Sequence, residues 1–166
     1  MKVIFDELFL IQLAPMKERL DKEGLEAILP HRDRALMIDR VEIENGKPIG
    51  YYTVTPEVCD GHFPDMPILR GVDRIEMIGI MLGIAALQSG KIHIPEGHWP
   101  VLTDAGRSSF RGYVHPGELV RLEVDLTRET RKFIEGNGKA FVGENVVAEV
   151  EGIKIFVVPK PKPPNP

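Results

Sequence analysis

The segment Met77–Leu87 most constrains how this chain folds, because its residues MIGIMLGIAAL are apolar on every side. It belongs to a helical stretch from about Gly71 to Gln88, and Gly90 and Pro95 end that stretch. A helix that is apolar all round is a buried helix. The segment is far shorter than the roughly 18–20 residues needed to span a bilayer. The rest of the chain is therefore expected to wrap around this helix.

Strand-like patterns lie on both sides of the helix. Asn45-Gly46 is a strong hairpin signal between the first two strands, and an irregular proline-containing loop at residues 56–70 follows them. The predicted strands are Ala35–Glu44, Pro48–Thr55, Val101–Phe110, Leu119–Thr130, Arg131–Val142 and Val146–Val157. This grouping predicts an α+β fold, in which an antiparallel sheet of about six strands wraps one long central helix.

Length and charge limit the number of domains and the kinds of partner. A chain of 166 residues forms one domain, expected at residues 29–158. An arm with a charged surface helix (1–28) precedes it, and a flexible proline-rich tail (159–166) follows. The net charge of −4 disfavours nucleic-acid binding, and the N-terminal apolar run is too short for a signal peptide. With one cysteine, Cys59, no internal disulfide is available, so we expect a soluble cytoplasmic protein with no membrane partner.

Two polar residues lie close to the buried helix. His62 lies in the loop before it, and Glu76 immediately precedes the apolar run. Histidine has a pKa suited to a general base, and desolvation should raise the pKa of Glu76 so that it can donate a proton near neutral pH. Backbone N–H groups at the helix start, near Gly71, would stabilise an oxyanion. The set suits proton abstraction beside a carbonyl with loss of a leaving group, although a turn histidine and a dipole-complementing glutamate would need no catalytic role.

Six motifs, spread in order over residues 29–157, carry a resemblance to a known family. They are LPHR (Leu29–Arg32), LMIDR (Leu36–Arg40), GHFPDMPILRGVDRIE (Gly61–Glu76), SFR (Ser109–Arg111), VHPGEL (Val114–Leu119) and GKA (Gly138–Ala140). The chain resembles the 3-hydroxyacyl-[acyl-carrier-protein] dehydratases of bacterial type II fatty-acid synthesis. That family has the hotdog fold, a curved antiparallel sheet around one long helix. Glu76 resembles the simple dehydratase branch, since the dehydratase–isomerase branch carries Asp there.

The resemblance implies a role for each site residue. His62 would remove a proton from C2 of a (3R)-3-hydroxyacyl thioester on acyl carrier protein, and Glu76 would help the 3-hydroxyl leave as water. The backbone N–H of Gly71 would polarise the thioester carbonyl, with Phe63 and Val72 beside the substrate. No metal and no organic cofactor would be needed. The family also implies a homodimer whose active sites each take the histidine and the carboxylate from different subunits, and dimers that assemble into a trimer of dimers.

Four residues depart from the family pattern around the acid. Arg70 replaces a proline before the helix glycine, Ile80 replaces a glutamine, and Asp73 and Arg74 stand where small or apolar residues are common. These changes bear on acyl chain length and on the pathway served. They also keep open a non-catalytic homologue that binds acyl groups or carrier protein. A hotdog thioesterase, with an acidic residue on the central helix to activate water, is the other alternative.

The remaining cysteine, histidines and arginines are weaker candidates for chemistry or binding. Cys59 is a possible nucleophile, but no base is oriented toward it, and His31 is interpreted as structural. A metal site would use His93, Glu96, His98 and Asp104. An acidic carrier protein would dock on Arg107, Arg111, Arg121, Arg128 and Arg131.

Overall fold

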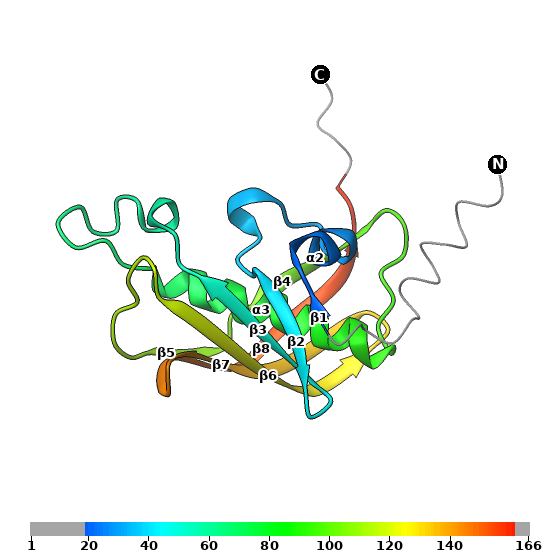
Figure 1. Cartoon of the computed structure of the whole chain (residues 1–166). Helices are drawn as coiled ribbons and strands as arrows, with labels where there is room; N and C mark the ends of the chain where they lie inside the picture. The colour runs from blue at the N-terminus through cyan, green and yellow to red at the C-terminus, as the bar shows by residue number, and fades with distance from the viewer. Residues whose placement is uncertain (1–18, 162–166) are drawn as a thin grey trace, which may run out of the picture.

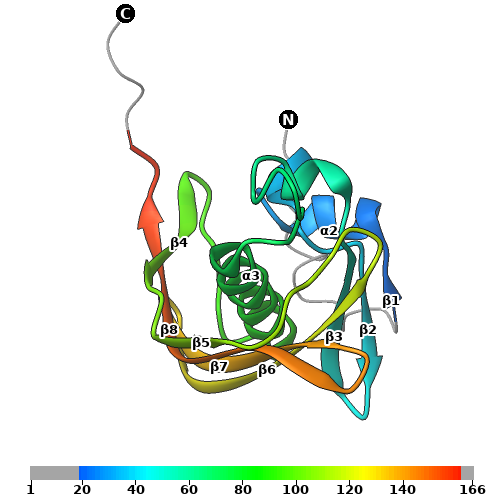
Figure 2. The same cartoon turned by 90° about the vertical axis from the view of Figure 1, so that its left-hand side faces the viewer.

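The computed structural model describes residues 19–161. Its strands are β1 (Arg19–Leu20), β2 (Arg40–Glu44), β3 (Lys47–Thr53), β4 (His98–Asp104), β5 (Arg107–Phe110), β6 (Leu119–Thr130), β7 (Phe133–Val142) and β8 (Asn145–Pro159). They form one antiparallel sheet in the order β1-β2-β3-β6-β7-β8-β4, and β5 pairs with a separate stretch of β8. The sheet curves around helix α3 (Gly71–Ser89) (Figure 1). Figure 2 looks roughly along the axis of α3 and shows the sheet wrapped around it.

Helix α3 forms the centre of the hydrophobic core. Met77, Ile78, Met81 and Leu82 on this helix have no exposed side-chain surface. Burial of each such side chain contributes about 1.5–3 kcal/mol. The helix ends at Ser89 and is capped by Gly90, which has a left-handed backbone (φ 71°) that favours glycine. The expected α+β class and the hotdog arrangement of sheet and helix are confirmed.

The strand count differs from the expected six because the predicted strand Val101–Phe110 is two strands. The chain turns between β4 and β5 at Gly106, whose φ is +64° and whose N–H donates to the Asp104 carboxylate at 2.9 Å. The other additional strand is β1, which pairs with β2 through Arg19 opposite Glu42. The sheet described in residues 19–161 therefore has eight strands.

The first helix begins later than its sequence pattern suggests. The leucine spacing in the charged segment at residues 16–29 predicts a helix, but α2 spans Lys22–Ile28. Asp21 caps it by accepting the Gly24 N–H at 3.0 Å. Leu25 is completely buried, so one face of this charged helix packs on the core.

The two expected terminal segments are only partly described. Residues 1–18 of the arm and 162–166 of the tail lie outside the described residues. Strand β8 continues to Pro159, and the Lys160 N–H then donates to the Gly97 carbonyl at 2.7 Å. None of the helices within residues 19–161 has the length and apolar character needed to cross a bilayer.

Candidate active site

The loop before α3 holds the His62 ring in a defined orientation. The His62 N–H donates to the Cys59 carbonyl at 3.0 Å, and the His62 carbonyl accepts from Ile68 N–H at 2.8 Å. The ring atom Nδ1 lies 3.1 Å from the carbonyl oxygen of Ile68. A carbonyl oxygen only accepts, so Nδ1 carries the proton and donates it. With Nδ1 as the donor, the neutral form of the ring has its lone pair on Nε2, which is the arrangement a general base needs.

Exposed apolar side chains lie against the His62 ring and at the start of α3. Phe63 stacks on the His62 ring at a centroid distance of 4.4 Å, and Phe63 and Val72 are 55% and 61% exposed. Gly71 is the first residue of α3, where the leading N–H groups have no partner within the helix. A Cβ at Gly71 would lie 3.1 Å from the Phe110 ring, so glycine permits this close contact. The helix start thus combines N–H donors with an apolar surround.

Arg70 stabilises the helix start that a proline would otherwise fix. Its Nε and Nη2 donate to the two carboxylate oxygens of Asp73 at 2.9 and 2.6 Å. Asp73 is only 2% exposed, and two-point pairing with a guanidinium is a strong form of charge-assisted hydrogen bond. The departures at positions 70 and 73 therefore form one ion pair.

Arg74 has a different role, inside the core. Only 4% of this residue is exposed, and its Nη1 donates to the Val147 carbonyl at 2.7 Å. Its guanidinium also lies 5.3 Å from the centroid of the Phe110 ring. The Nε atom is buried with no hydrogen-bond partner in the described structure. Arg74 therefore links α3 to β8 and to the aromatic ring that covers Gly71.

Glu76 lies at an apolar groove between α3 and the edge of the sheet. The groove has a volume of about 240 Å³ and is lined by Leu29, His31, Glu76, Gly79, Ile80, Gly83, Pro100, Leu102 and Ile155. Two of these nine residues, His31 and Glu76, are ionisable. Ile80 adds a further apolar side chain to the wall. The arrangement suits an apolar chain with a polar group at one end.

The described chain shows no hydrogen bond between His62 and Glu76, the two residues that the sequence pairs as base and acid. His62 is not among the residues that line the groove, and Glu76 is exposed in the single chain. The residue beside Glu76 is instead His31, which sequence reasoning had interpreted as structural. Burial lowers the pKa of His31, while the negative charge of Glu76 acts in the opposite direction. The only sequence signal for His31 was its place in the Leu29–Arg32 motif.

The alternative chemical sites receive no support from the geometry. Within residues 19–161, no group of three or more His, Cys, Asp or Glu side chains is placed to hold a metal ion. Of the expected ligands, Asp104 pairs with Lys154 at 2.8 Å, and the His98 ring lies against the Glu96 carbonyl. Cys59 is fully buried, and this burial raises the pKa of its thiol. A buried, protonated thiol is a poor nucleophile.

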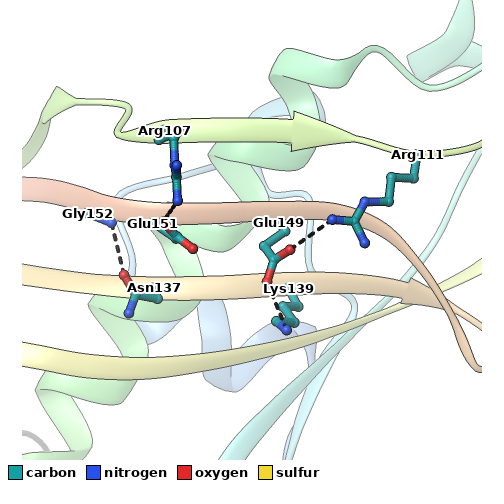
Figure 3. A network of polar contacts seen from close by, with 7 residues as sticks. All are labelled: Arg107, Arg111, Asn137, Lys139, Glu149, Glu151 and Gly152. Carbon is teal, nitrogen blue, oxygen red and sulfur yellow. Dashed lines mark hydrogen bonds and ion pairs between the residues drawn. The ribbon is translucent and has the colours of Figure 1, made fainter.

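Three of the five candidate docking arginines are paired with carboxylates. Arg107 contacts Glu151, Arg111 contacts Glu149 at 3.3 Å, and Lys139 shares Glu149 at 2.8 Å (Figure 3). Arg121 pairs with Glu123. Surface pairs of this kind contribute little stability, but they neutralise much of the positive charge. This face of β5, β7 and β8 is therefore a mixed-charge surface.

The comparisons with known proteins agree with the motifs. Residues 29–151 match the family model described as a FabA-like domain. The chain belongs to this family. It is 34% identical over 159 residues to the 3-hydroxyacyl-[acyl-carrier-protein] dehydratase FabZ of Koribacter versatilis, covering 92% of this chain and 99% of that relative. It is 35% identical over 136 residues to the protein of the same name from Clostridium acetobutylicum, covering 80% and 94%. The family expected from the motifs is confirmed.

Solved structures support the fold of this FabA-like chain. A Streptococcus mutans protein bound to acetyl CoA matches with a TM-score of 0.54 at 16% identity, covering 80% of this chain and 97% of that one. A hypothetical thioesterase from Streptococcus pneumoniae, solved with coenzyme A, matches with a TM-score of 0.52 at 7% identity, covering 95% and 99%. At these identities the likeness shows the hotdog fold alone.

Proposed function

We propose that this chain is a hydro-lyase that dehydrates (3R)-3-hydroxyacyl thioesters on acyl carrier protein to trans-2-enoyl thioesters. The pathway is the biosynthesis of fatty acids or related lipids. The observation that carries the proposal is the His62 ring, whose Nδ1 donates to Ile68 and whose Nε2 keeps its lone pair. The FabZ dehydratases, which share about a third of their residues with most of this chain, support the same activity.

The reaction needs a base, an acid and an oxyanion site. His62 Nε2 takes the proton from C2, and the electron pair of that C–H bond forms the C2–C3 double bond. Glu76 gives a proton to the 3-hydroxyl, which leaves as water. The Gly71 N–H, at the positive end of α3, stabilises the negative charge on the thioester oxygen. Phe63 and Val72 supply apolar contact around the reacting carbons. Proton exchange with solvent then resets both side chains.

The complete site lies between two subunits of a homodimer in this proposal. Glu76 faces a groove from which His62 is absent, and the exposed edge strand β4 borders the same groove. Trp99, Val101 and Leu102 on this strand are 41%, 37% and 43% exposed. An apolar, unpaired edge favours association with another strand. A second copy there would cover β4 and bring its own His62 loop to Glu76. Further assembly into a trimer of dimers stays a prediction.

Two other expectations about partners and place stay predictions. Acyl carrier protein is the proposed substrate carrier, and its acidic surface would have to compete with Glu149 and Glu151 for Arg111 and Arg107. Arg131 and Arg128 are exposed, and Arg128 lies over the Phe133 ring at 5.5 Å. A cytoplasmic location is the expectation from the single cysteine and the short N-terminal apolar run.

Substitution of the base and of the acid tests this function. His62→Ala and Glu76→Gln should each lower the hydration of a crotonyl thioester by about 10²–10⁴-fold, because each removes a proton-transfer group. Exposed His93 and Glu144 provide matched controls, and His93→Ala and Glu144→Gln should retain wild-type rates. Wild-type rates in the His62 and Glu76 variants would disprove the assignment. Release of free thiol from an acyl thioester would identify a thioesterase instead.

A further inference from the structure

His31 is held rigidly at the polar end of the groove. It follows Pro30 in the segment that leaves α2, and the Arg32 guanidinium binds the surrounding backbone. Arg32 donates to the carbonyl oxygens of Glu26, Leu29 and His31 at 2.7, 2.7 and 2.6 Å. Three bonds from one planar group fix the direction in which the His31 side chain leaves the backbone. Its ring is therefore preorganised beside Glu76.

The two ring nitrogens of His31 are in different environments. Nδ1 is buried and has no hydrogen-bond partner within the described structure. A buried N–H without an acceptor is rarer in proteins than a buried acceptor with an unused lone pair. The proton of a neutral His31 ring is therefore expected on Nε2. Because His31 lines the groove and Nδ1 is sealed from solvent, the Nε2 edge is the part of the ring available to the groove.

The surroundings of His31 favour the neutral ring. Burial is the largest influence and lowers the pKa of His31, and the nearby Arg32 acts in the same direction. Glu76 opposes them. A neutral imidazole with its proton on Nε2 is a hydrogen-bond donor toward the groove, where Glu76 is the other ionisable residue.

We propose that His31 is a positioning residue, which donates its Nε2 proton to one carboxyl oxygen of Glu76 and directs the other toward the acyl substrate. This role rests on the proposed dehydration. A carboxylic acid carries its transferable proton on one oxygen. A donor that binds the second oxygen prevents the carboxyl group from turning its proton away from the substrate. The exposed Glu76 side chain has many rotamers in the single chain, so such a restraint is valuable.

The tautomer of His31 can be measured without activity. A two-bond ¹H–¹⁵N correlation spectrum of the histidine rings separates the two neutral tautomers and the charged ring, and a His31→Gln variant assigns the signal. The chain has five histidines, so the spectrum is simple. At pH 7 we expect the neutral form with the proton on Nε2. A proton on Nδ1, or a charged ring, would overturn the proposal.

Kinetics test the positioning role. His31→Leu removes the donor and should lower kcat by about 10–100-fold with little change in KM, the loss expected for a hydrogen bond to the carboxylate charge that develops as Glu76 gives up its proton. His31→Gln keeps an N–H near the position of Nε2 and should recover most of kcat. His93→Leu is the control, since His93 is exposed and outside the groove.

The outcomes separate this proposal from the proposed function. A wild-type protein without dehydratase activity overturns the function and the role of His31 together. An active wild type that is matched by His31→Leu overturns only the role of His31, and so does equal loss in the Leu and Gln variants. Thermal melting shows whether His31→Leu is folded. If it is not, the recovery in His31→Gln and the tautomer measurement decide.

Discussion

At the scale of single residues, Cys59 shows how burial decides chemistry. The side chain is fully buried next to the His62 loop, and this burial raises the pKa of the thiol. The thiolate is the reactive form, so both access and ionisation are suppressed. In the native protein at pH 8, a disulfide reagent such as Ellman's should therefore label Cys59 at least about 100-fold more slowly than in guanidinium.

The labelling measurement has a simple control, because Cys59 is the single cysteine of the sequence. One equivalent of thiol should react in denaturant and almost none in the same time in buffer. Rapid labelling of the native protein, with retained dehydratase activity, would show that the 56–70 loop opens readily. Labelling that abolishes activity would instead place Cys59 close to the reacting groups.

At the scale of elements, the contact between α3 and β7 depends on glycine. A Cβ at Gly138 would lie 2.3 Å from Ile78 Cγ2 and 3.2 Å from the Glu123 carbonyl oxygen. Gly138→Ala should lower the free energy of unfolding by about 1–3 kcal/mol, because the helix must move away from the sheet. For a chain of this size, that corresponds to a melting temperature lower by about 2–12 °C.

A double-variant cycle checks the physical reason for this loss. Ile78→Ala removes the side-chain atom that an alanine at position 138 would strike, although it leaves a cavity of its own. The double variant should therefore be less destabilised than the sum of the two single variants. Strict additivity in chemical denaturation would mean that the two positions are not in contact.

The same elements show what can be predicted from sequence alone. The β2–β3 hairpin follows from Asn45-Gly46, whose φ angles of 52° and 78° are those that this pair adopts easily. The central helix follows from its apolar run. Strand β1 has two residues and no periodic pattern, so it forms only because β2 offers an edge. The turn between β4 and β5 was indicated in the sequence by Asp104-Ala105-Gly106, but the apolar residues nearby favoured one continuous strand.

The residue types proposed for the candidate site come from the sequence, but the grouping of residues around the groove comes from the structure. His62 and Glu76 follow from their motif, whereas the hydrogen bond of His62 to Ile68 sets the ring tautomer and depends on the loop conformation. His31 lines the groove because of how residues 29–32 pack beside α3 and β4. Nothing in the sequence indicates that Arg74 is buried. Arginine is almost never fully buried unless it is paired, and the partner of Arg74 on β8 is supplied by the tertiary fold.

At the scale of the whole molecule, the edge strand β4 and the open groove suggest that one chain holds an incomplete site. In the proposed dimer, each site takes His62 from one subunit and Glu76 from the other. A dimer of one His62→Ala chain and one Glu76→Gln chain then has one site with both defects and one site with none. The twofold symmetry of such an interface makes this distribution unavoidable.

Mixing the two inactive variants should therefore restore activity. After joint unfolding and refolding in equal amounts, a site has one chance in two of an intact His62 and one in two of an intact Glu76. The mixture should recover about a quarter of the wild-type crotonyl hydration rate under a symmetric two-subunit arrangement. Each variant refolded alone, and wild type taken through the same treatment, are the controls. A mixture no more active than the separate variants would mean that both residues of a site belong to one chain, because no mixed dimer would then contain an intact pair.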